Sequence, residues 1–173
     1  MIMKILGAGL TVLGTAGLGI GMCREQRERM GLLGEFERFL ELAAGEISYG
    51  ACSLPVLFSE LAETVPGPTG QLLAAVGIRL QSENGESLTQ IWNEEMEVYL
   101  LGTPLHMEEK QLICSFPEEL EFLDRQRQMQ ALERLGERIG RIRQQLAEKQ
   151  ETFEKTTMAL CLAGGAVSVI LFL

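Results

Sequence analysis

With 173 residues, a formal charge of −9 and one histidine, the chain fits a single domain and offers little histidine-based catalytic or metal chemistry. An acidic chain is also a poor nucleic-acid binder, because phosphate groups are bound by basic surfaces. Aromatic residues make up 6% of the chain, too few for a β-sandwich or barrel built from many short strands.

Charged and apolar residues lie in different parts of the chain. Residues 5–22 and 156–173 contain no charged side chain, whereas every acidic residue and all but one of the basic residues lie between them. Each apolar segment has about the length that crosses a hydrocarbon core of roughly 30 Å. We therefore expect an N-terminal transmembrane helix over 1–23, a helical domain over 24–155 and a C-terminal transmembrane helix over 156–173.

Basic residues flank both predicted spans on the side of the central domain. Arg24, Arg27 and Arg29 follow the first span, and Lys149 and Lys155 precede the second. Because such residues tend to stay in the cytoplasm, the central domain is predicted to be cytoplasmic, with both termini across the membrane. A cleavable signal peptide is the alternative for the first segment, since small residues near its end could form a cleavage site.

Both predicted spans contain pairs of small residues four positions apart. Gly17 and Gly21 form one pair, and Gly164 and Ser168 form another. Small residues allow helices to approach closely in lipid, so these pairs are candidate packing faces. The simpler interpretation is that glycine is common in membrane helices.

Two apolar stripes with alternating spacings of three and four residues flank the centre of the chain, which is typical of amphipathic helices. The first stripe is Leu33, Phe36, Leu40, Ala43 and Ile47, and the second is Leu132, Leu135, Ile139, Ile142 and Leu146. In an antiparallel pairing, the position numbers of facing residues have the same sum to within one residue. The stripes therefore predict a two-helix stalk, with each helix continuous with its span.

The region between the stripes is predicted to form short helices, because no stretch alternates with the period of a strand. The expected helix starts are Ser53 with Pro55, the turn Pro66-Gly67-Pro68, the capping box Ser87/Gln90 after Asn84-Gly85, Thr103-Pro104, and the capping box Ser115/Glu118 of the long return helix. The predicted fold is all-α: a small cytoplasmic helical bundle on an antiparallel two-helix stalk, flanked by two transmembrane helices.

The central region is strongly acidic. Residues 30–123 contain sixteen acidic residues against three basic ones. This excess indicates either a solvated tip that anionic lipid repels or a docking face for a basic partner. The candidate partner-binding residues surround the single tryptophan, Trp92, which we expect in the core; they are Glu83, Glu86, Glu94, Glu95 and Glu97.

The sequence shows no pattern typical of a catalytic or metal site. Cys23, Cys52, Cys114 and Cys161 lack zinc-binding spacing and are expected to be reduced structural cysteines. His106 is expected to be a surface histidine. No phosphate loop or nucleophile elbow follows a strand-like run. We therefore expect no enzyme activity, no cofactor, no metal and no small-molecule substrate.

The order of these parts resembles the stage III sporulation protein AB family of endospore-forming bacteria over essentially the whole chain. The most specific matches are Glu46-Ile47-Ser48-Tyr49-Gly50 at the end of the first helix and Gly85-Glu86-Ser87-Leu88 leading to Trp92. A return helix around Asp124 completes the pattern. The chain departs from the family at Ser53-Leu54, where the family has Pro-Leu, and at Phe116 to Glu121, before Asp124.

The resemblance implies a platform component of a secretion-like channel complex between mother cell and forespore. It implies a cytoplasmic domain similar to that of the type II secretion inner-membrane platform protein. A secretion-type ATPase, other channel-complex membrane proteins and membrane lipid are the implied partners, and the implied location is the outer forespore membrane facing the mother cell. The alternative is a membrane-anchored structural or signalling hairpin without an ATPase.

Overall fold

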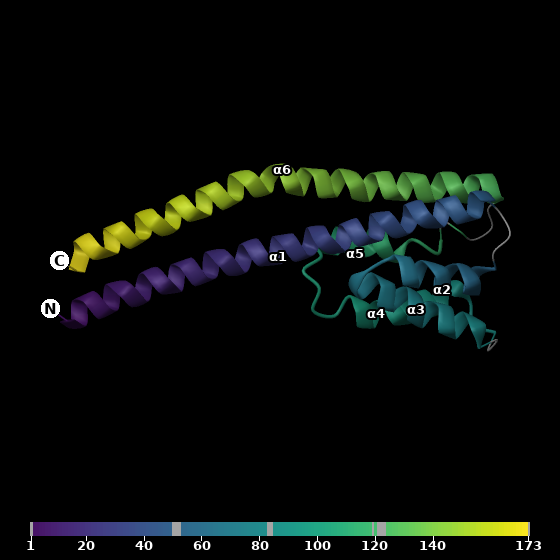
Figure 1. The fold of residues 1–173 in the computed structure, drawn as a ribbon, viewed down its shortest axis with the longest axis horizontal. Helices are drawn as coiled ribbons and strands as arrows, with labels where there is room; N and C mark the ends of the chain where they lie inside the picture. Colours follow the sequence, from purple (N-terminus) through teal and green to yellow (C-terminus); the bar gives the residue numbers. More distant parts are fainter. Residues whose placement is uncertain (1, 50–52, 83–84, 119, 121–123, 173) are drawn as a thin grey trace. The chain divides into compact units, whose positions relative to one another are not determined.

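The computed structural model describes residues 2–49, 53–82, 85–118, 120 and 124–172, with the backbone alone for most residues of 2–19 and 151–172. All elements of these described residues are helices (Figure 1): α1 (Ile2–Tyr49), α2 (Leu54–Thr64), α3 (Gly67–Gln81), α4 (Leu88–Tyr99), α5 (Met107–Cys114) and α6 (Arg125–Phe172). The prediction of an all-α chain is confirmed.

The chain divides into two compact units, one formed by residues 1–28 and 144–173 and the other by residues 29–143. The long helices α1 and α6 each run without a break from one unit into the other, as predicted. Among the described residues, no helix contains an apolar stretch long enough to cross a membrane. The predicted spans fall largely on side chains outside the described set, so they and the domain limits at 23/24 and 155/156 stay predictions.

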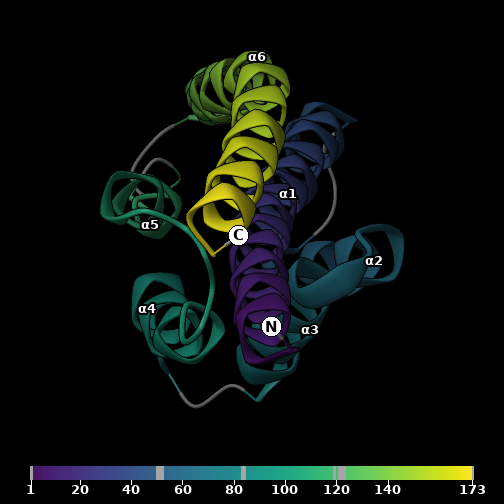
Figure 2. The same cartoon turned by 90° about the vertical axis from the view of Figure 1, so that its left-hand side faces the viewer.

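Within residues 29–143, α1 and α6 lie antiparallel and side by side (Figures 1 and 2). The Arg143 Nε atom lies 2.8 Å from Oε2 of Glu37. A Cβ atom built at Gly136 would lie 3.8 Å from Cβ of Leu40, which is an ordinary van der Waals contact and shows that the two helices are in direct contact here. Seven of the ten stripe residues are buried, and Ile47, Ile142 and Leu146 are half-buried.

The register of this helix pair gives a prediction that can be tested directly. Cysteines placed at Leu40 and Ile139, in a background without native cysteines, should form a disulfide within one chain on mild oxidation. The matched control pairs Leu40 with Arg138, which is the exposed neighbour of Ile139 and should not crosslink. Gel mobility without reductant measures disulfide formation in the test pair and in the control pair. Crosslinks only between chains would mean that the stripes serve an oligomer interface.

The start of α3 is held by a carboxylate from α1. The backbone N–H of Thr69 donates to Oε2 of Glu35 at 3.3 Å, which satisfies one of the free donors at a helix N-terminus. Gly67, the first residue of α3, has a φ of 77°. This backbone conformation favours glycine, and a side chain there would also have to displace the Glu35 carboxylate.

Two of the predicted helix starts are wrong. α5 begins at Met107 rather than at Thr103-Pro104, and α6 begins at Arg125 rather than after Ser115. The Thr103 hydroxyl donates to the Leu100 carbonyl at 3.0 Å, and the Ser115 hydroxyl donates to the Leu112 carbonyl at 2.8 Å. Each hydroxyl therefore bonds back toward the preceding helix instead of capping the next one.

Other side chains cap these helices. The Glu109 carboxylate accepts the His106 N–H at 2.9 Å in front of α5, and the Asp124 carboxylate accepts the Arg127 N–H at 3.0 Å in α6. The predicted cap of α4 is confirmed in part. Ser87 Oγ accepts the Gln90 N–H at 3.1 Å, but the Gln90 side chain donates to Glu94 instead of completing the box.

Five aromatic rings form the centre of the core, contributed by α1, α2, α4 and the turn after α5. They are Phe36, Phe39, Phe58, Trp92 and Phe116. The Trp92 and Phe116 ring centroids are 4.6 Å apart, and the Trp92 indole N–H donates to the Ile113 carbonyl at 3.3 Å. Trp92 is fully buried, which confirms its predicted place in the core.

Candidate functional site: an acidic cluster around Arg79

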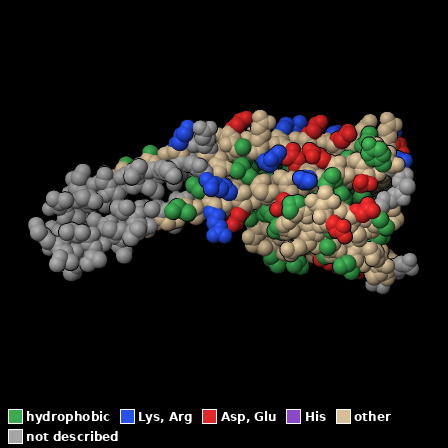
Figure 3. All heavy atoms as spheres, in the orientation of Figure 1, with side chains coloured by type: hydrophobic (Ala, Val, Ile, Leu, Met, Phe, Trp, Pro, Cys, Tyr) green, Lys and Arg blue, Asp and Glu red, His purple; other side chains and the backbone are tan. Residues whose placement is uncertain are grey.

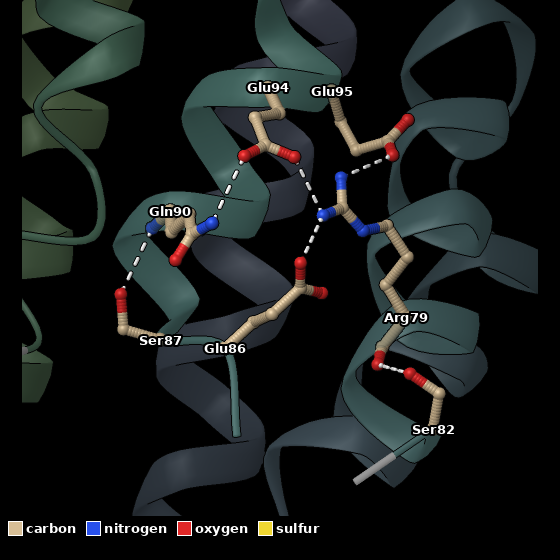
Figure 4. A network of polar contacts seen from close by, with 7 residues as sticks. All are labelled: Arg79, Ser82, Glu86, Ser87, Gln90, Glu94 and Glu95. Carbon is tan, nitrogen blue, oxygen red and sulfur yellow. Dashed lines mark hydrogen bonds and ion pairs between the residues drawn. The ribbon is translucent and has the colours of Figure 1, made fainter. Parts of the chain in front are cut away.

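Three carboxylates converge on Arg79, which lies in the last turn of α3 (Figure 4). Its Nη2 atom lies 2.9 Å from Oε1 of Glu86 and 2.7 Å from Oε2 of Glu94, and its Nη1 atom lies 3.1 Å from Oε1 of Glu95. The guanidinium therefore links α3 to α4 and to the segment just before α4. We call these four residues the Arg79 cluster.

Helix geometry positions this cluster. Glu94 and Glu95 lie in the middle of α4, while Glu86 immediately precedes Ser87, the N-cap of that helix. The Gln90 amide, one turn before Glu94, donates to Glu94 Oε1 at 3.2 Å. The opposite end of the α3/α4 pair is fixed by Thr69 and Tyr99, whose hydroxyl oxygens are 3.0 Å apart. These contacts at both ends hold the carboxylates on one surface.

The cluster keeps a negative charge although its members are paired. Three carboxylates and one guanidinium give a formal charge of −2. Hydrogen bonds from Arg79 and then from Gln90 lower the pKa of Glu94, and hydrogen bonds to Glu94, Glu95 and Glu86 raise the pKa of Arg79. Glu94 and Arg79 are therefore both charged at neutral pH. The excess of carboxylates over the single guanidinium suits the arrangement to binding a cation-bearing partner.

A second charged cluster lies in the interior. Arg29 is 7% exposed and Glu109 is 2% exposed. The Arg29 Nε atom donates to both Glu109 oxygens at 3.0 and 2.9 Å, and Nη2 donates to Oε1 at 2.6 Å. Arg29 Nη1 also lies 3.0 Å from Nε2 of His106, whose side chain is otherwise exposed. Because these groups bond to one another, the cluster ties α5 to α1.

A shallow groove of about 450 Å³ lies beside α1 and α6, lined by Gly34, Glu37, Arg38, Glu41, Leu42 and Arg143. Two acidic and two basic side chains balance each other there. The groove is therefore a weaker candidate site than the Arg79 cluster, where the charge is unbalanced.

The family model of stage III sporulation protein AB matches residues 4–173. The chain belongs to the stage III sporulation protein AB family. A solved structure of a stage III sporulation protein AB has the same fold, with a TM-score of 0.66 and 19% sequence identity over 72% of this chain and 98% of that one. No curated protein matches the chain. Family membership gives the protein a role in sporulation, and the family is not a known enzyme family.

The structure brings together three of the five predicted partner-binding residues of this family member. Glu86, Glu94 and Glu95 bind Arg79, whereas Glu97 is exposed on α4 outside the cluster. Glu83 lies outside the described residues. Sequence reasoning missed the central position of Arg79, because its partners are fixed by the packing of α3 on α4. Its rarity, as one of three basic residues in 30–123, was the available signal.

Arg29 follows the first predicted span together with Arg24 and Arg27, yet its side chain is buried in the structure, whereas theirs are exposed. Its buried partner Glu109 explains the difference, because a guanidinium can leave water where a carboxylate pairs with it.

The cysteines give no sign of metal or redox chemistry within the described residues. No three His, Cys, Asp or Glu side chains of this part of the chain gather in a way that could hold a metal ion. Cys23 and Cys114 are free thiols, whereas the side chains of Cys52 and Cys161 lie outside the described set. Burial raises the pKa of the Cys114 thiol, which keeps it protonated and unreactive at neutral pH.

Proposed function

We propose that this protein is a non-enzymatic membrane platform component of a sporulation secretion-like channel complex, and that it docks a cytoplasmic secretion-type ATPase. Family membership supports the sporulation context. The observation that carries the docking proposal is the Arg79 cluster, where packing holds three carboxylates on one surface with a formal charge of −2. Such a surface attracts a basic partner and speeds its association.

The proposal includes two membrane anchors, formed by the uncharged segments 5–22 and 156–173. The central domain then lies in the cytoplasm, and by family resemblance the membrane is the outer forespore membrane facing the mother cell. Gly17 with Gly21 and Gly164 with Ser168 are proposed packing faces for other membrane proteins of the complex. The basic residues on the inner side of both segments support this topology.

Topology can be tested by cysteine labelling in a background without native cysteines. A membrane-impermeant maleimide added to intact vegetative cells, which carry the expressed chain in the cell membrane, should miss Glu63→Cys, an exposed position in α2. A cysteine added after Leu173 should react. Labelling at position 63 would overturn the cytoplasmic assignment and favour a cleaved signal peptide.

Docking can be tested with the full chain in phosphatidylcholine nanodiscs and a candidate secretion-type ATPase. Replacing Glu86, Glu94 and Glu95 with glutamine should slow association several-fold and flatten its salt dependence, because the cluster charge changes from −2 to +1. Screening lengths fall from about 10 Å at 0.1 M salt to about 3 Å at 1 M. Glutamine is preferable to lysine, which would place further cations against Arg79.

A matched control distinguishes the effect of the Arg79 cluster on association from the effect of total charge. Glutamine at the exposed Glu60, Glu63 and Glu118 removes the same number of carboxylates and should leave association nearly unchanged. If both triple variants slowed association equally, the effect would depend on the total negative charge of the domain and not on the Arg79 cluster. Absence of ATPase binding by the unmodified chain would favour the structural or signalling hairpin.

A further inference from the structure

Helix α4 has an exposed face that combines apolar and acidic side chains. Its members follow the spacing i, i+3, i+4 and i+7 of one helical face, and they are Glu94, Glu97, Val98 and Leu101. Val98 is 68% exposed and Leu101 is 77% exposed. Leu101 lies in the turn that follows α4, where its N–H donates to the Val98 carbonyl at 3.2 Å. This turn extends the exposed face beyond the end of the helix.

The residues of this face are exposed, unlike those on the side of α4 that packs into the core. The core side is formed by Ile91, Trp92 and Met96, which are all buried. Single exposed apolar residues are common and need no explanation. Val98 and Leu101 are three residues apart, however, so one apolar partner surface could bury both side chains together.

The charged part of the face fits a basic partner. Glu94 is held in place by Arg79 and Gln90, and Glu97 is exposed beside it. The other two carboxylates of the Arg79 cluster, Glu86 and Glu95, lie close to Glu94 around the Arg79 guanidinium (Figure 4). Acidic and hydrophobic side chains both appear over the region of α2, α3 and α4 (Figure 3). Apolar residues beside polar and charged ones match the anatomy of a recognition surface, which has an apolar centre and a polar rim.

We propose that the face formed by Glu94, Glu97, Val98 and Leu101 binds a basic amphipathic helix of a partner protein. Val98 and Leu101 supply apolar anchors, while the carboxylates select lysine or arginine and set the orientation. Glu94 and Val98 are one helical turn apart on α4. The partner helix therefore presents its basic residues toward Glu94 and Glu97 and its apolar residues toward Val98 and Leu101 at the end of α4. The identification of that partner as the ATPase rests on the proposed function.

The probe for this face is a synthetic 14-residue helix of lysine and leucine with one apolar side, compared with a scrambled peptide of the same composition. Binding is measured by calorimetry to the full chain in phosphatidylcholine nanodiscs, with empty nanodiscs subtracted. The amphipathic peptide should bind about tenfold or more tightly than the scrambled one, because only the former buries Val98 and Leu101 together.

Two double variants distinguish the apolar contribution to peptide binding from the electrostatic one. Val98→Ser with Leu101→Ser should weaken peptide binding about tenfold or more with little change in salt dependence. Glu94→Gln with Glu97→Gln should weaken binding several-fold and remove most of the salt dependence. Matched controls are Ile78→Ser, an equally exposed apolar residue of α3, and Glu60→Gln with Glu63→Gln; neither should change binding.

The same samples separate this proposal from ATPase docking. Equal binding of both peptides, or no effect of the Val98/Leu101 variant, would overturn the amphipathic face. ATPase binding that survives in the Val98/Leu101 variant would mean that the ATPase docks elsewhere, which overturns the ATPase as the partner of this face and leaves the proposed function intact. Peptide binding without ATPase binding would support the face and overturn the ATPase as its partner. Helicity and thermal unfolding of each variant exclude misfolding as the cause.

Discussion

Glu109→Gln should lower the free energy of unfolding by about 3–5 kcal/mol, because it leaves the Arg29 guanidinium buried without its counter-charge. The two side chains are 7% and 2% exposed and share three close N–O contacts, at 3.0, 2.9 and 2.6 Å. Glu109 also accepts the His106 N–H in front of α5, a bond that glutamine can keep through its amide oxygen, so the expected loss comes from the unpaired guanidinium. Urea unfolding followed by fluorescence of the single buried tryptophan measures the change.

The matched control for Glu109→Gln is the exposed pair Arg24–Glu28. Its N–O distance is also 3.0 Å, but the side chains are 80% and 54% exposed. Glu28→Gln should change the free energy of unfolding by less than about 1 kcal/mol, because water screens such a pair. Arg29→Met combined with Glu109→Leu should recover much of the lost stability, since apolar pairs often replace buried ion pairs without cost. Equal small effects at positions 28 and 109 would contradict the buried pair.

The apolar stripes of α1 and α6 could be predicted from the sequence because helix periodicity and burial impose the same pattern. Leu33, Phe36, Leu40 and Ile139 are almost completely buried, as their spacing requires. Trp92 could be placed in the core for the same reason. The all-α class follows from the absence of strand-like alternation, and the structure contains only helices among its described elements.

The ends of helices were predicted less well, because a hydroxyl side chain can bond in either direction along the chain. Ser87 accepts an N–H from the helix that follows it, whereas Thr103 and Ser115 donate to carbonyls of the helices that precede them. Both uses satisfy free backbone groups at a helix terminus. Local sequence does not decide between them, since the choice depends on where the next helix can pack.

The candidate site was predicted only as a set of nearby carboxylates. The sequence places Glu86, Glu94 and Glu95 close together along the chain, but their common partner Arg79 belongs to another helix. The α4 face was missed for a similar reason. Val98 and Leu101 are apolar, and the sequence alone does not distinguish them from the buried Ile91, Trp92 and Met96 of the same region.

Trp92→Ala should lower the free energy of unfolding by about 3–5 kcal/mol, because it empties the centre of the aromatic core. The Trp92 ring lies 4.6 Å from Phe116 and about 6 Å from Phe36, Phe39 and Phe58, with centroid distances of 6.0, 6.1 and 6.2 Å. The substitution also removes the indole donor of the Ile113 carbonyl. Urea-dependent proteolysis measures the change, since this variant has no tryptophan fluorescence.

Two further substitutions show whether the position of α4 depends on this core. Trp92→Phe keeps an aromatic ring but loses the hydrogen bond to Ile113, so its effect should be smaller than that of alanine. Tyr49→Ala, at a residue that is 93% exposed, should stay within about 0.5 kcal/mol of the unmodified chain. Because Trp92 anchors the helix that carries Glu94, Val98 and Leu101, Trp92→Ala should also weaken binding of the amphipathic peptide. An unchanged free energy of unfolding for Trp92→Ala would contradict the importance of the aromatic core. Unchanged peptide binding by this variant would show that the α4 face does not depend on that core.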